Sequence, residues 1–107
     1  MLFLATVSRN LSIATARSGF EALEKIKDET PSLIILDVMM PGMDGFEVLA
    51  RLRRLPDAER VPVMVLTGYS DAVERARDAG AQEVMLKPFE KNLFVKKVLQ
   101  LLQDVRV

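Results

Sequence analysis

The chain has 107 residues, of which 15 are basic and 15 acidic, and half of the residues are hydrophobic. This length fits one small domain with its own core, and the balanced charge gives no support to nucleic-acid binding, which requires a basic face. Cysteine and histidine are both absent, which excludes disulfides, thiolate metal sites and the Ser-His and Cys-His catalytic pairs.

No apolar run approaches the roughly 20 residues that a membrane span requires. The apolar start, residues 1–7, lacks the basic region and the small-residue cleavage site of a signal peptide. We therefore expect a cytoplasmic protein without membrane association.

Residues 11–16 alternate apolar and small polar side chains, which predicts a strand. Ser18 and Glu21 then form a capping-box pattern, in which a hydroxyl precedes a carboxylate by three residues, so a helix is expected to begin there. The predicted core face of this helix carries Phe20, Leu23 and Ile26.

Residues 33–36 form a continuous apolar run that ends at Asp37. Such runs suit a strand that is covered on both faces, as in a parallel sheet. After a loop, Asp44 is expected to cap a helix that runs to about Leu55. Residues 61–66 then form the next strand, which ends at Thr67.

Asp71 begins a second capping pattern before a short helix, and Gly80 is a good residue to end it. Residues 83–86 form the last strand, which ends at Lys87, and residues 92–104 form the last helix. Alternating strands and helices predict an α/β domain with a mainly parallel sheet and helices on both faces. The core side of the last helix is expected to carry Phe94, Val98, Leu101 and Leu102.

Polar residues end three of the predicted strands: Asp37, Thr67 and Lys87. In a doubly wound sheet these ends meet in one crevice, where ligands bind. An acid, a hydroxyl and an ammonium together suit phosphoryl transfer. The carboxylate attacks phosphorus and becomes an acyl phosphate, and the other two groups contact the phosphoryl oxygens.

Three segments of the chain resemble receiver domains of response regulators. Residues 36–45 look like the phosphoacceptor loop, residues 62–69 like the strand that ends in the switch hydroxyl, and residues 80–89 like the last strand with its Lys-Pro pair. The resemblance runs from about Leu11 to the C-terminus. It implies a flavodoxin-like doubly wound fold and a single receiver-like domain, residues 1–107, that is truncated at its N-terminus relative to the family.

The resemblance also implies roles for individual residues. Asp37 is the phosphoacceptor, Thr67 and Lys87 contact the phosphoryl group, and the backbone carbonyl of Met39 binds Mg²⁺ together with Asp37. The bond between Lys87 and Pro88 is expected to be cis, which is inexpensive only before proline. The implied partners are a sensor histidine kinase or phosphotransfer protein and a downstream protein, and the chain is not expected to be an enzyme.

The chain departs from the receiver pattern in two places. Receiver domains open with a strand that ends in two acidic residues, which hold Mg²⁺, but the first acidic residue here is Glu21. Mg²⁺ prefers carboxylate and other oxygen ligands, so the missing pair argues for slow or absent phosphorylation. Val84 stands where many receivers have a switching Tyr or Phe, and Tyr69 is interpreted as an exposed loop residue.

Two interpretations of residues 1–10 stay open. As the tail of the family's first helix, favoured by alignment, the segment leaves the central place in the sheet empty. As a strand, it fills that place, but only antiparallel, because residues 8–10 are too short for a crossover. Asn10 would then take the left-handed position of a tight turn, and exchange of the strand with a second chain is a variant of this interpretation.

Two functions follow as alternatives. The first is a phosphoacceptor receiver domain of a two-component phosphorelay. The second is a phosphorylation-independent interaction or dimerisation module that uses the last helix, where Lys91, Lys96 and Lys97 set the choice of partner. An aspartyl-phosphate hydrolase is a weaker alternative, because nothing in the sequence resembles a substrate pocket.

Overall fold

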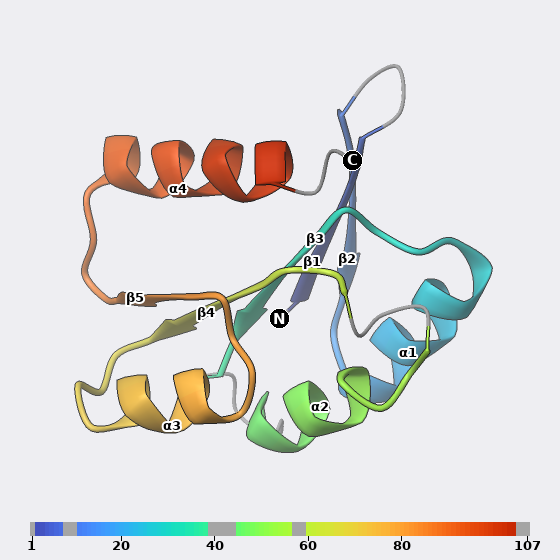
Figure 1. Ribbon diagram of the computed structural model, residues 1–107, viewed down its shortest axis with the longest axis horizontal. Helices are drawn as coiled ribbons and strands as arrows, with labels where there is room; N and C mark the ends of the chain where they lie inside the picture. The colour runs from blue at the N-terminus through green and yellow to red at the C-terminus, as the bar shows by residue number, and fades with distance from the viewer. Residues whose placement is uncertain (1, 8–10, 39–44, 57–59, 105–107) are drawn as a thin grey trace.

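The computed structural model describes residues 2–7, 11–38, 45–56 and 60–104. Five strands and four helices alternate after an initial hairpin (Figure 1). The strands are β1 (Leu2–Val7), β2 (Leu11–Ala16), β3 (Leu33–Asp37), β4 (Val63–Thr67) and β5 (Glu83–Leu86). The helices are α1 (Gly19–Asp28), α2 (Gly45–Leu52), α3 (Ala72–Asp78) and α4 (Lys91–Asp104).

The strands form one sheet in the order β2-β1-β3-β4-β5. This is the strand order of flavodoxin-like doubly wound folds, so the predicted fold class is confirmed. β3, β4 and β5 are parallel to one another, whereas β1 is antiparallel to both of its neighbours. The sheet is therefore mainly parallel, with one reversed strand near its middle.

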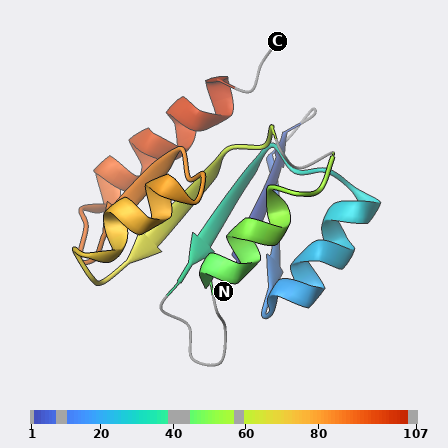
Figure 2. The ribbon, with the colours of Figure 1, turned by 60° about the horizontal axis from the view of Figure 1, so that its bottom comes forward.

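Helices cover both faces of the sheet, but unequally (Figure 2). α1, α2 and α3 lie on one face, where their apolar residues meet side chains such as Leu4, Leu36 and Val65. α4 lies on the other face, over a second cluster that includes Met64 and Met85. In the described parts of the chain no helix is long and apolar enough to cross a membrane.

The favoured interpretation of residues 1–10 as a helix tail is wrong, because residues 2–7 form β1. The side chain of Leu4 is buried on one face of the sheet and that of Ala5 on the other. The backbones of β2 and β3 would otherwise present unpaired groups in the sheet interior, which is costly, and so short a segment nucleates a helix poorly. The predicted turn at Asn10 lies outside the described residues.

Most helix predictions are confirmed. The side-chain oxygen of Ser18 accepts a hydrogen bond from the backbone N–H of Glu21. Gly80 follows α3 with a φ of 106°, the left-handed conformation that favours glycine. The four predicted core residues of α4 pack against the second cluster, namely Phe94, Val98, Leu101 and Leu102.

Two details of the helix predictions are wrong. Phe20 was expected on the core face of α1, yet its side chain is 76% exposed. Successive helical residues are about 100° apart, so Phe20 points almost opposite to Ala22, which is buried with Ile26. Asp71 precedes α3 but makes no side-chain capping bond, because its own backbone is already helical. The predicted cap at Asp44 lies outside the described residues.

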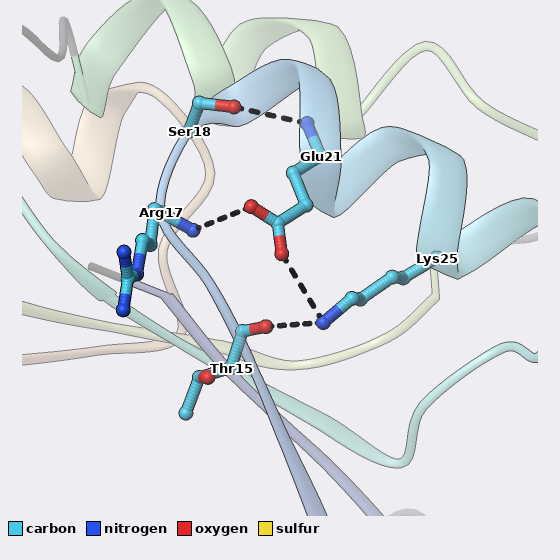
Figure 3. Close-up of polar contacts among 5 residues, drawn as sticks. All are labelled: Thr15, Arg17, Ser18, Glu21 and Lys25. Carbon is cyan, nitrogen blue, oxygen red and sulfur yellow. Dashed lines mark hydrogen bonds and ion pairs between the residues drawn. The ribbon is translucent and has the colours of Figure 1, made fainter.

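A polar network joins β2 to the start of α1 (Figure 3). The carboxylate of Glu21 accepts a hydrogen bond from the backbone N–H of Arg17 at 3.2 Å and lies 3.3 Å from Lys25 Nζ. Lys25 Nζ also donates to the backbone carbonyl of Thr15 at 2.5 Å. These contacts lower the pKa of Glu21, mainly through the bond from the Arg17 backbone and next through Lys25. They also cover part of the open edge of β2, where unpaired backbone groups invite pairing with other strands.

Candidate functional site

The three predicted site residues lie at the same edge of the sheet. In the parallel registers, Asp37 is opposite Leu66, and Thr67 is opposite Leu86. Lys87 directly follows Leu86, so the carboxyl ends of β3, β4 and β5 bring the acid, the hydroxyl and the ammonium together. This is the edge at which open α/β sheets bind ligands.

Asp37 and Lys87 are in direct contact. Lys87 Nζ donates a hydrogen bond to Asp37 Oδ2 at 2.6 Å. The side chain of Lys87 is 37% exposed and that of Asp37 is 18% exposed. The backbone also holds Lys87 in place, because its N–H donates to the carbonyl of Thr67 at 2.7 Å. The Lys87–Pro88 bond is cis, as expected. The ammonium is thus positioned within reach of any anion bonded to Asp37.

Thr67 is the one polar residue among the fully buried side chains of the described residues. Its Oγ1 accepts a hydrogen bond from the backbone N–H of Tyr69 at 3.1 Å. Tyr69 itself is 60% exposed, which confirms its interpretation as an exposed loop residue. Thr67 therefore connects the site to the loop between β4 and α3.

A hollow of about 440 Å³ opens beside Thr67. Phe46, at the start of α2, and Arg75, in α3, lie on its rim, with the Arg75 guanidinium carbon 3.9 Å from the centre of the Phe46 ring. Sequence analysis missed this pair, because no pattern along the chain signals a contact between two helices. The pair links α2 to α3 next to the site. The wall of the hollow consists of Val38, Phe46, Thr67, Tyr69, Asp71, Ala72 and Arg75.

Gly45 also has a role at the site that sequence analysis did not assign. A Cβ atom at Gly45 would lie 2.9 Å from the Cα of Val38, the residue after Asp37. The absence of a side chain thus allows α2 to begin directly against the end of β3. A glycine immediately after a predicted helix cap, inside the phosphoacceptor motif, is the signal in the sequence from which this close approach could have been predicted.

The residues present do not fit a Mg²⁺ site of the kind that receiver domains use. Within the described ranges, no three acidic, histidine or cysteine residues are grouped to hold a metal ion. One oxygen of Asp37 already faces the Lys87 ammonium, and Met39, the implied carbonyl ligand, lies outside the described residues. Because Mg²⁺ needs several oxygen ligands, usually with one or two carboxylates, we derive no step of the chemistry through it.

Val84 is 8% exposed and belongs to the core on the side of the sheet that α3 covers. Its small aliphatic side chain fills space in this core but offers no ring that turns between an inward and an outward position. Coupling of Thr67 to a ring at this position, as the receiver pattern would have it, is therefore not available to this chain.

A five-stranded α/β sheet with an aspartate, a buried threonine and a lysine at three parallel strand ends defines a receiver-type protein. The model of the response regulator receiver domain matches residues 2–99, and the chain belongs to this family. The predicted resemblance is thus confirmed, and the match begins at residue 2 rather than at about Leu11, where the resemblance was expected to begin.

Curated relatives and solved structures agree with this assignment. The chain is 33% identical over 104 residues to the transcriptional regulatory protein AfsQ1 of Streptomyces coelicolor, covering 95% of this chain and 45% of that protein. It is 38% identical over 97 residues to the response regulator MprA of Mycobacterium leprae, covering 89% of this chain and 42% of that protein. The chain thus spans less than half the length of these relatives.

Two solved structures show the same architecture. The receiver domain of a signal transduction histidine kinase from Syntrophus aciditrophicus is 35% identical with a TM-score of 0.75, and the match covers 85% of this chain and 70% of that chain. The chemotaxis response regulator CheY4 of Vibrio cholerae is 30% identical with a TM-score of 0.73, and the match covers 82% of this chain and 75% of that chain.

Proposed function

We propose that the chain is a phosphoacceptor module that receives a phosphoryl group on Asp37 from a sensor histidine kinase or a phosphotransfer protein. The observation that carries the proposal is the contact of 2.6 Å between Lys87 Nζ and Asp37 Oδ2. It places a cation beside the partly buried carboxylate of Asp37, where the negative charge of an incoming phosphoryl group would develop.

The chemistry is a single displacement at phosphorus. A carboxylate oxygen of Asp37 forms the new P–O bond, while the P–N bond of the donor phosphohistidine breaks and its imidazole takes the electron pair. The Lys87 ammonium then contacts a phosphoryl oxygen as charge partner, and the Thr67 hydroxyl donates a hydrogen bond to another. The phosphorylated chain signals to a downstream protein through its surface.

Acetyl phosphate tests the proposal because it needs no partner protein. Incubation should add about 80 Da, one phosphoryl group, and intact-mass spectrometry measures the rate with Mg²⁺ and with EDTA in parallel. The Asp37→Asn variant should gain nothing, whereas Asp28→Asn, which changes an exposed carboxylate at the end of α1, should match the wild type. An unmodified wild type in both buffers, or an equal adduct in Asp37→Asn, would contradict the proposal.

A second candidate function is supported by a separate observation, the buried valine at position 84, which has no ring to respond to phosphorylation. Here the receiver fold acts as an interaction module whose partner affinity does not depend on phosphorylation. Asp37→Ala distinguishes the two functions once a partner has been purified. Unchanged affinity supports the second, and a large loss of affinity supports the first.

A further inference from the structure

α4 carries apolar side chains on more of its surface than the sheet covers. Phe94, Val98 and Leu101 pack against the sheet, yet Val95 and Leu99 are 44% and 54% exposed. With about 100° between successive residues, Val95 and Leu99 lie together on one flank, about a quarter turn from the residues that face the sheet. A helix that is apolar on two sides is normally covered on both.

An ion pair on the other flank of α4 shows which way the exposed flank of Val95 and Leu99 faces. Lys97 lies on the opposite flank, and its Nζ is 3.2 Å from the carboxylate of Glu83 in β5. Val95 and Leu99 therefore turn away from β5, toward the half of the sheet formed by β1 and β2. Figure 2 shows α4 over the β4 and β5 side, and no other helix of the described chain lies on this face of the sheet.

The uncovered part of this face continues the exposed flank of α4. Phe3 of β1 packs at the border of the second cluster and is only partly buried. Its neighbours across the sheet are Ile35 in β3 and the exposed Thr15 in β2. We call the surface formed by Phe3, Thr15, Val95 and Leu99 the open strip.

Positive charge borders the open strip. α4 includes three lysines and one acidic residue, Asp104 at its end, and Glu90 directly precedes the helix. Lys97 is paired with Glu83, whereas Lys91 and Lys96 form no ion pair with any residue that the structure describes. In a symmetric dimer through this surface, the lysines of one copy would approach those of the other, which is unfavourable. A partner with acidic residues fits better than a second copy.

We propose that the open strip is the docking surface for an amphipathic α-helix of a partner protein. The apolar stripe of that helix lies beside α4, over β1 and β2, and its Glu or Asp residues lie next to Lys91 and Lys96. A helix fits because it packs alongside another helix at 8–10 Å while its apolar side rests on a neighbouring surface. Asp37, Thr67 and Lys87 are not among the residues that form the strip, and docking is proposed independently of the proposed phosphoacceptor function.

A pair of designed peptides tests the proposal on the full chain. One fluorescently labelled peptide of about five turns carries leucines at i, i+3, i+4 and i+7 spacing with Glu on the flanks. The matched peptide has Lys in place of every Glu. Fluorescence anisotropy should show saturable binding of the Glu peptide at micromolar concentrations and roughly tenfold weaker binding of the Lys peptide.

Two leucines of α4 provide matched variants. Leu99→Asp should weaken binding of the Glu peptide at least about tenfold, because Leu99 lies centrally in the strip. Leu93→Asp makes the same change on the other flank, where the side chain is 44% exposed, and should stay within about twofold of the wild type. Lys96→Glu should reverse the preference between the two peptides, and Asp37→Asn should bind as the wild type does.

Three results would overturn the proposal. They are no saturable binding of the Glu peptide, equal losses in Leu93→Asp and Leu99→Asp, and a wild-type dimer on size-exclusion chromatography that Leu99→Asp dissociates. The last result would make a second copy the occupant of the strip. Circular dichroism of each variant shows whether it is folded, and the reversal by Lys96→Glu tests the charge argument without removing any apolar contact.

Discussion

The two halves of the sheet differ in strand direction. β3, β4 and β5 run parallel, and their carboxyl ends bring Asp37, Thr67 and Lys87 to one edge. β1 and β2 form an antiparallel pair, and the register of Leu2 opposite Leu36 places the amino end of β1 at that same edge. The reversed strand thus restores the packing of the sheet but cannot present residues from its carboxyl end to the site.

Because of this difference, we expect the antiparallel half of the sheet to contribute to stability and the parallel half to carry the proposed chemistry. Leu2 and Leu4 of β1 are almost completely buried and join the core that α1 and α2 cover. The groups that would meet a phosphoryl group all come from the parallel half. Changes in β1 should therefore act on folding, and changes at the ends of β3 to β5 should act on phosphorylation.

The largest expected effect is on stability and comes from β1. Leu4→Ala should lower the free energy of unfolding by about 2–5 kcal/mol, because it leaves a cavity in a closed core. Urea unfolding followed by circular dichroism measures the change. Leu99→Ala, at an exposed leucine of α4, should change stability by less than about 0.5 kcal/mol. Equal losses in the two variants would mean that β1 does not carry the packing described above.

The next effect concerns the chemistry of the parallel half. Lys87→Gln should slow phosphorylation by acetyl phosphate about a hundredfold, because it removes the cation beside Asp37 but keeps the backbone bond to Thr67. The adduct measured over time by mass spectrometry gives the rate. Lys27→Gln, at an exposed lysine of α1, serves as the control. A rate within twofold of the wild type would exclude Lys87 from the reaction.

A smaller loss of stability is expected at the edge of the sheet opposite the site. Arg53 donates to the carbonyls of Val61 and Gly80 at 2.8 and 2.7 Å and to the side chain of Gln82 at 2.6 Å. Burial also lowers the pKa of its guanidinium. Arg53→Met should cost about 1–3 kcal/mol, since it removes the donor to the carbonyls of Val61 and Gly80, whereas the Gln82 oxygen keeps its bond from the backbone N–H of Val63.

Thermal unfolding measures the effect of Arg53→Met, with Arg54→Met as the matched control at the neighbouring exposed arginine. The control should change stability by less than about 0.5 kcal/mol. The phosphorylation rate of Arg53→Met should stay unchanged well below its unfolding temperature, because the network lies at the far end of β4 and β5. A slower reaction in the folded variant would mean that the Arg53 network affects phosphorylation at the opposite edge of the sheet.

The smallest effect is a pH dependence of stability from Glu21. The backbone of Arg17 and then Lys25 hold the pKa of Glu21 below its ordinary value of 4.5. A carboxylate with a lowered folded pKa stabilises the fold above its unfolded pKa, and the contribution disappears as the pH falls through the folded value. Glu21→Gln should therefore flatten the loss of stability below about pH 4.5. Denaturant titrations at several pH values, with Glu24→Gln as control, measure this, and identical curves for both variants would contradict it.

Much of the parallel half could be predicted from the sequence, because its signals are local. The apolar runs before Asp37 and Thr67 predict buried strands, and the polar residue after each run predicts where the strand ends. Gly80 marks the end of a helix. The meeting of Asp37, Thr67 and Lys87 at one edge followed from the predicted parallel sheet, whereas the ion pair between Lys87 and Asp37 was not predicted. Phe20 was misplaced because its spacing from Leu23 fits a helical face, while the true centre of that face is occupied by Ala22, a residue that carries little hydrophobic signal.

The sequence by itself determined the strand ends and the residues they carry, since a buried strand needs apolar residues and stops where charge begins. It also determined that no acidic residue precedes Glu21. Only the tertiary structure decided the conformation of residues 2–7, because alignment favoured a helix tail whereas the empty place in the sheet favoured a strand. The unpaired backbones of β2 and β3 leave a central place that a strand alone can fill, and the short connection allows it to enter only in reverse.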